Sequence, residues 1–383
     1  MGLTVTLLDV GAALDELVAQ VCGRCPVLEY GVSVAAVARS GRRGRRPRRA
    51  VHSGRQAATL ETRGMTPVTI PAAGSGAADG MPEVSALAGE AARTAGVTIR
   101  TVHDVAGMRA VADFFAQVWQ TPHATPPYPS EVLHSLVHAG GAVHAAYSAW
   151  PSGERLAGAA VAVFGPPAER DVYSFVAAAT ASGRGVGFAV KQAQRLWALE
   201  RGATTMRWTF DPLVSRNARF NLVKLGAVGS EYLVDFYGPM SDGVNNGDES
   251  DRLAVVWDLV SGTTRTDDPA EGRSTADVVR RAPDGGPLTL RAGDRLWCRV
   301  PDDIVALRAA DPALSLDWRH AVREVFTEAY DRGLRATAMS RDGWYLLTRP
   351  SPGLPSAGAV ATAAASSEAT SRIASESASE EQE

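Results

Sequence analysis

Apolar positions over the middle of the chain alternate, or recur at helical spacing, and so predict a succession of strands and helices. Val97–Val102 reads as a strand, and Asp104–Trp119 places apolar residues at three- and four-residue intervals behind an aspartate cap. Ser130–His138 predicts a second, short helix. Ala142–Ala149 and Leu156–Phe164 are apolar runs joined by a Pro-Ser-Gly turn, which predicts a hairpin.

The next elements surround a glycine-rich loop. Asp171–Ala177 predicts a strand, Ser182–Gly187 the loop, and Phe188–Arg201 a helix. A strand, a helix and a final strand are expected after it, at Thr205–Phe210, Asn217–Leu225 and Val228–Phe236. The order β-α-α-β-β-β-α-β-α-β predicts an α/β fold, with a mixed sheet and helices on its faces.

A connector rich in Pro, Gly and Asp, at about 261–286, separates this domain (97–260) from a small C-terminal α/β extension (287–350). Two strands, an amphipathic helix and a closing hairpin are expected in the extension, at Leu288–Leu290, Leu296–Val300, Ala313–Arg332, Arg335–Met339 and Trp344–Thr348. The extension carries no recognisable chemistry, and we expect it to pack on the first domain or to complete it.

Both ends of the chain have low-complexity composition. The leader, 1–96, contains an arginine block at 39–49 and then little periodicity, and the tail, 351–383, is built from Ser, Ala and Glu. Such segments bury too little apolar surface to offset their ordering entropy, so both are predicted to be disordered. The block could tether the chain to a polyanion, but a solvated linker, or a leader upstream of the true start, is the simpler interpretation.

Composition excludes several classes of protein. A net charge of -3 and 45% hydrophobic residues in 383 fit an ordinary soluble protein and do not favour a nucleic-acid binder. No apolar run is long enough to span a membrane, and no secretory signal is evident, so a cytoplasmic location is expected. Of the 39 basic residues only Lys191 and Lys224 are lysines. Both lie in the segment that carries the motifs.

A metal centre is not expected. The 3 cysteines are too few for a disulfide framework, and Cys22 and Cys25 form a single CxxC without nearby ligands. His134 and His138 are four residues apart on a predicted helix, but the glutamate of a metalloprotease helix is missing between them.

The glycine-rich loop is the most informative segment. A strand, a glycine-rich loop and a helix together direct free backbone N–H groups at a phosphate, and the helix dipole favours negative charge there. Arg184 can add a charge-assisted contact to phosphate oxygens.

In this segment the chain resembles the GNAT acyltransferases, whose pyrophosphate loop has the pattern Arg/Gln-x-x-Gly-x-Gly/Ala. Gly185 and Gly187 match the two small positions, whereas Ser182 replaces the preferred Arg or Gln. The segments Trp208–Leu213, Ser215–Asn221 and Lys224–Ala227 are similar to the fifth strand and fourth helix of a bacterial subgroup of predicted acetyltransferases.

The resemblance implies that acetyl-CoA or another acyl-CoA lies between the strands Asp171–Ala177 and Thr205–Phe210. The residues implied for the cofactor are Ala177, Ala179, Arg184, Gly185, Val186, Gly187, Phe188 and Asn217. The implied reaction is N-acyl transfer to the amine of a small molecule. Arg216 and Arg219 would suit an acceptor that bears a carboxylate, such as an amino acid. The oligomeric state stays open, with a homodimer among the possibilities.

The catalytic groups are less well defined. Asp211 and Glu231 are the carboxylates that could serve as the general base. Many family members carry a tyrosine on the fourth helix as the general acid, but Leu222 stands at that position here, and Tyr237 is the candidate replacement.

Two other functions remain open from the sequence. A degenerate acyl-CoA-binding protein would share the loop without catalysing transfer. A dinucleotide-binding protein would share the strand, the glycines and the helix, with Asp211 as its acidic residue. Two features argue against a dinucleotide site. The third glycine of the dinucleotide fingerprint would fall at Phe188, and five residues separate the strand from Gly183, whereas the fingerprint follows its strand closely.

Overall fold

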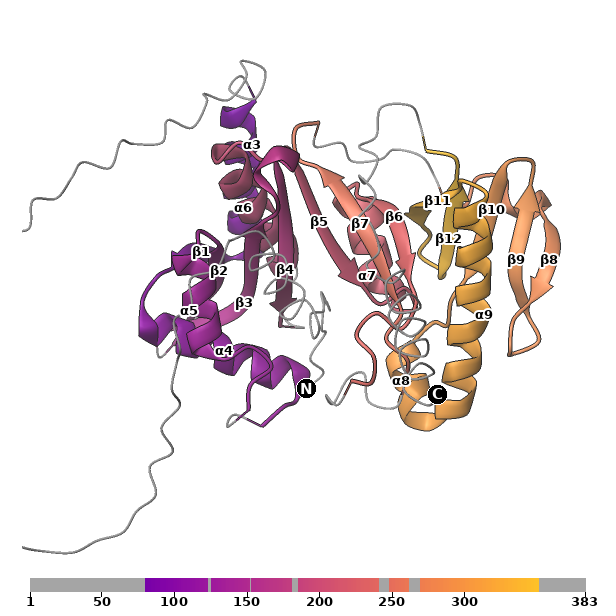
Figure 1. Ribbon diagram of the computed structural model, residues 1–383, viewed down its shortest axis with the longest axis horizontal. Coiled ribbons are helices and arrows are strands. Elements are labelled where there is room, and N and C mark those ends of the chain that lie inside the picture. Colours follow the sequence, from indigo (N-terminus) through magenta and orange to yellow (C-terminus); the bar gives the residue numbers. More distant parts are fainter. Residues whose placement is uncertain are drawn as a thin grey trace, which may run out of the picture. The chain divides into compact units, whose positions relative to one another are not determined.

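A computed structural model describes residues 80–122, 125–151, 153–180, 185–240, 248–261 and 269–350 (Figure 1). All of these residues belong to one compact unit. The arginine block, both residues of the CxxC, Arg184 and the acidic tail lie outside the described residues.

The larger sheet has seven strands in the order β1-β2-β3-β4-β5-β7-β6. Their bounds are β1 Val97–Val102, β2 Ala142–Trp150, β3 Gly153–Phe164, β4 Asp171–Ala179, β5 Thr205–Phe210, β6 Val228–Leu233 and β7 Arg252–Asp258. Every described neighbouring pair in this sheet is antiparallel except β4–β5, which is parallel. The predicted α/β fold with a mixed sheet is therefore confirmed.

Helices cover both faces of this sheet. Their bounds are α3 Met81–Ala95, α4 Val105–Trp119, α5 Ser130–His138, the short 3-10 turn η1 Pro167–Glu169, α6 Val186–Glu200, α7 Ser215–Arg219 and the π-helical turn η2 Phe220–Lys224. Residues alternate between two core clusters along β2 and β3: one cluster includes α3 and α6, and the other α4 and α5. This alternation is what a strand with both faces buried requires.

The C-terminal extension forms a second sheet of five strands, in the order β11-β12-β10-β9-β8. The bounds are η3 Arg273–Thr275, β8 Asp277–Arg281, β9 Pro287–Ala292, β10 Arg295–Arg299, α8 Ile304–Ala310, α9 Pro312–Asp331, β11 Arg335–Met339 and β12 Trp344–Thr348. The cluster that contains α6 continues through Trp318 and Phe326 of α9 to Leu347 of β12. The two sheets thus share one apolar core.

Four sequence predictions need correction. The last part of the expected disordered leader is the helix α3, whose Val84, Ala88 and Ala91 are buried on the side of α6. The helix expected at 217–225 begins at Ser215 and continues from Phe220 as a π-helical turn.

The last two corrections concern missed or shortened elements. The strand expected at 228–236 ends at Leu233. The second sheet begins at Asp277, within the expected connector, and α8 was not predicted. No helix in the described parts of the chain combines the length and the apolar character needed to cross a membrane.

Candidate functional site

The strands β4 and β5 pair only at their beginnings. The register joins Asp171 to Thr205, Val172 to Met206 and Tyr173 to Arg207, and no later residue of either strand is paired across this boundary. β4 nevertheless continues to Ala179 beside β3, and β5 continues to Phe210 beside β7. The two strands therefore diverge toward their carboxyl ends, as Figure 1 shows.

The divergence leaves backbone groups of β4 without a partner among the described strands. Thr180 N donates to Ala157 O across the β3–β4 ladder, at 2.8 Å. Hydrogen-bonded pairs alternate along an antiparallel ladder, so Ala178 also directs its N–H and C=O groups at β3. Ala177 and Ala179 direct theirs to the other side, into the opening between β4 and β5.

The helix α6 begins just after this end of β4. Its first intrahelical hydrogen bond runs from Ala189 N to Gly185 O, at 2.9 Å, and no side chain among the described residues caps the helix. The N–H groups of Val186, Gly187 and Phe188 therefore have no acceptor within the helix. Gly185 has a φ of 93°, a left-handed conformation that glycine adopts without strain.

A buried lysine lies at the point where the strands diverge. Lys191 of α6 is 1% exposed, and its Nζ donates to Ser174 Oγ at 2.7 Å and lies 3.8 Å from the ring centroid of Trp208. Ser174 and Trp208 each directly follow the last paired residues, Tyr173 and Arg207. Burial lowers the pKa of Lys191 well below its ordinary value.

Two asparagines of the segment after β5 are also buried. Asn217, which sequence reasoning assigned to the cofactor, is 1% exposed on α7. Asn221, which it missed, is fully buried, and neither its Oδ1 nor its Nδ2 has a hydrogen-bond partner among the described residues. Its neighbour Phe220 lies beside the first turn of α6, since a Cβ on Gly187 would stand 3.9 Å from Phe220 Cζ. The four-residue spacing of the two asparagines places them on one face of a helix, and this spacing was the sequence signal that could have identified Asn221.

Solved structures, but no family models or curated proteins, are similar to this chain. Among solved structures, an N-acetyltransferase from Staphylococcus aureus Mu50 is similar at 13% identity and a TM-score of 0.34, over 43% of this chain and 98% of that one.

Two further structures are similar to the same degree. A ribosomal-protein-alanine N-acetyltransferase from Brucella melitensis has 16% identity and a TM-score of 0.33, over 42% of this chain and 99% of its own. A Bacillus subtilis acetyltransferase in complex with CoA has 19% identity and a TM-score of 0.29, over 42% of this chain and 98% of its own.

The surroundings of Asp211 are those of a buried ion pair and not those of a general base. It directly follows β5, is 2% exposed, and accepts hydrogen bonds from Arg308 of α8 and Arg319 of α9. Asp248 pairs with the same two arginines. Burial raises the pKa of Asp211, but the two guanidiniums outweigh this effect and hold the pKa far below its ordinary range.

The assignment of Asp211 as a base is therefore corrected. Both of its oxygens are occupied, and a carboxylate so strongly stabilised in its charged form is a poor proton acceptor. The cluster has a structural role instead. It links the carboxyl end of β5, which does not pair with β4, to α8 and α9 of the C-terminal extension.

The other two catalytic candidates lie on or just after β6. Glu231 is exposed on β6, at a bulge in its pairing with β7. The Tyr237 hydroxyl lies 3.1 Å from Thr209 Oγ1, on the part of β5 that does not pair with β4, and the Arg252 guanidinium lies over the Tyr237 ring. The structure thus places the Tyr237 hydroxyl against Thr209 of β5.

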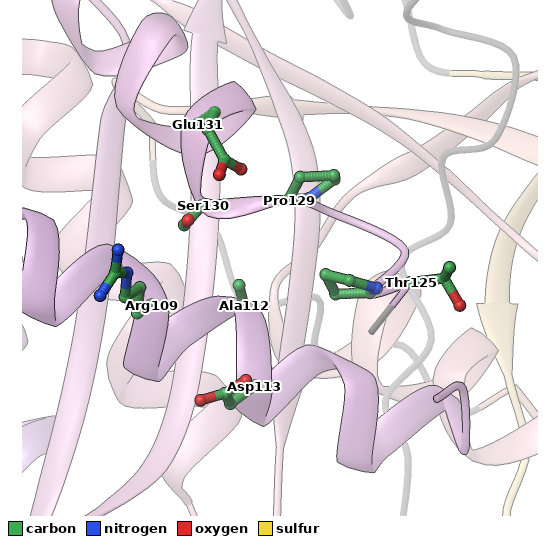
Figure 2. A pocket seen from close by; sticks show the side chains of 8 residues that line it. Arg109, Ala112, Asp113, Thr125, Pro129, Ser130 and Glu131 are labelled. Atoms are coloured by element: carbon green, nitrogen blue, oxygen red, sulfur yellow. The ribbon is translucent and has the colours of Figure 1, made fainter. Parts of the chain in front are cut away.

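A separate surface hollow of about 560 Å³ lies between α4 and the start of α5 (Figure 2). Its charged lining comes from Arg109 and Asp113 on α4 and Glu131 on α5, and none of the residues predicted for the site lines it. His134 and His138 are exposed on α5. Across the described ranges, no three His, Cys, Asp or Glu side chains are grouped so that they could hold a metal ion.

Proposed function

We propose that this protein is an N-acyltransferase of the GNAT type, which binds acyl-CoA in the opening between β4 and β5 and transfers the acyl group to an amine. The observation that carries the proposal is the divergence of two parallel strands in the middle of a mixed sheet, with a helix N-terminus at the open end. An extended ligand can run along β4, bonded to backbone groups that have no strand partner, and end its anionic part at α6.

The residues present fit such a ligand. Ala177 and Ala179 would hold the amide-containing pantetheine arm through their backbone groups, and Gly185 to Phe188 would hold the pyrophosphate. We propose Asn221 as a further contact, because neither polar atom of its buried amide has a hydrogen-bond partner among the described residues. We retain Asn217 and Arg184 as proposed contacts of the same ligand.

When bound, acyl-CoA would supply an acyl thioester. Transfer then requires a general base and a general acid from the side chains of the protein. A base must take a proton from the acceptor amine as its nitrogen bonds to the acyl carbon, and Glu231 is the proposed group. An acid must give a proton to the sulfur as the carbon–sulfur bond breaks. We propose the Tyr237 hydroxyl for this role, held by its contact with Thr209.

The dinucleotide alternative fits the sheet less well. A dinucleotide fold binds across several parallel strands, whereas β4–β5 is the only parallel pair among the described strands. A protein that binds acyl-CoA without transferring the acyl group would share the geometry, so turnover must distinguish it from an enzyme.

The test is release of free thiol from acetyl-CoA and succinyl-CoA in the presence of a panel of amines that includes amino acids. We expect thiol release with at least one acceptor, and a turnover about tenfold or more lower in Tyr237→Phe, with KM for the acyl donor nearly unchanged. The matched control is Tyr147→Phe on β2, which removes a hydroxyl from a strand remote from β5 in the sheet order and should keep wild-type turnover.

Two results would count against the assignment. Binding of acyl-CoA without thiol release, across the whole panel, would favour the non-catalytic alternative. Wild-type turnover in Tyr237→Phe would exclude Tyr237 as the acid and leave solvent or the acceptor as the proton source.

A further inference from the structure

The amine of Lys191 occupies an unusual position for a charged residue. It is buried at the point where β4 and β5 diverge, bonded to Ser174 and lying against the Trp208 ring and the Met206 sulfur. Ser174 in turn donates to Gln194 Oε1, at 2.9 Å. No carboxylate in the described part of the chain forms an ion pair with this amine.

Packing alone does not account for a lysine here. Burying an ammonium without a counter-charge is unfavourable, and a methionine of similar length would fill the same space without that penalty. The low pKa of Lys191 reflects this penalty. A carboxylate brought to the same place would restore the charged form and pair with it.

The location indicates where that carboxylate would come from. A ligand whose pyrophosphate lies at the start of α6 and whose arm follows β4 has its acyl end nearest to Ser174, where the opening closes. We propose, in an inference that rests on the proposed function, that Lys191 forms the blind end of the acyl site. There it selects acyl groups that end in a carboxylate, such as succinyl. Acetyl would leave the amine without a counter-charge.

The experiment compares wild-type full-length protein with Lys191→Met by calorimetric titration with CoA, acetyl-CoA and succinyl-CoA. The wild-type protein should bind succinyl-CoA at least about tenfold more tightly than acetyl-CoA, the range expected for a buried hydrogen bond between charged groups. In Lys191→Met the ratio should fall to near one. Lys224→Met, which changes the other lysine of the chain at an exposed position, is the matched control and should keep the wild-type ratio.

Three outcomes would overturn the inference. Wild-type affinities for the two thioesters within about twofold of each other would do so without any variant, and so would a Lys191→Met protein that keeps the preference for succinyl. If the wild-type protein binds none of the three compounds, the proposed function itself fails. Binding of CoA without a preference for succinyl removes only the role of Lys191.

Discussion

At the residue scale, Asp211 and its two arginines form a buried charged cluster whose loss should be measurable. We predict that Asp211→Asn lowers the free energy of unfolding by about 3 kcal/mol, because it leaves two buried guanidiniums with one carboxylate between them. Urea denaturation at neutral pH measures this effect. The exposed Asp277→Asn on β8 is the control and should change stability by less than about 0.5 kcal/mol. Equal stability of Asp211→Asn and wild type would contradict a structural role.

The same aspartate should make stability depend on pH. Because its pKa is lowered on folding, its stabilising contribution is complete above the pKa of an unfolded aspartate, about 3.9, and is lost as the pH falls further. The denaturation midpoint of Asp211→Asn should therefore fall less steeply on acidification than that of the wild type. Parallel acid titrations of the two proteins would argue against this aspartate as the source of the pH dependence.

Such a cluster could not be predicted from the sequence. A lone aspartate after a strand is compatible with a base, a cap or an ion pair, and only the fold decides among these. Its partners Arg308 and Arg319 are 97 and 108 residues away in the sequence, so no local pattern could reveal them. Lys191 is different, because its rarity in an arginine-rich chain was visible in the sequence, although its burial was not.

At the scale of elements, apolar spacing was sufficient for most strands and for α4, α5 and α9. β1 was predicted with its observed bounds, and the Asp104 cap was predicted too, since its Oδ1 accepts from Gly107 N at 2.8 Å. The missed elements have weak local signals. The helix α3 is rich in small residues and resembles the low-complexity leader before it, and β8 exposes both Val278 and Val279.

We predict that a chain begun at Met81 keeps CoA binding and stability, whereas a chain begun at Val97 does not. The second truncation removes α3 and exposes the face of α6 that covers Val84, Ala88 and Ala91, a loss of roughly 3–5 kcal/mol. Thermal unfolding of the two truncated chains is the measurement. A chain begun at Val97 that is as stable as one begun at Met81 would show that α3 contributes little to folding.

At the scale of the whole compact unit, the extension and the opening are connected. The arginines of α8 and α9 bind the residue that directly follows β5, and the core around α6 continues into the second sheet. The sequence predicted an extension that packs on the first domain or completes it, but not that it anchors one side of the opening. That link depends on charged pairs between distant segments, which periodicity does not report.

The central claim is that acyl-CoA binds with its pyrophosphate at the start of α6, and titration of CoA into Gly187→Glu and Gly187→Gln tests it most directly. The two variants add side chains of nearly equal size at the first turn, and the helix dipole tolerates the acidic one, so both should fold. Wild-type protein should bind CoA, Gly187→Glu should lose binding through charge repulsion with the pyrophosphate, and Gly187→Gln should retain more of it. Equal CoA affinity in the wild type and in Gly187→Glu, or binding of NAD in place of CoA, would contradict the claim.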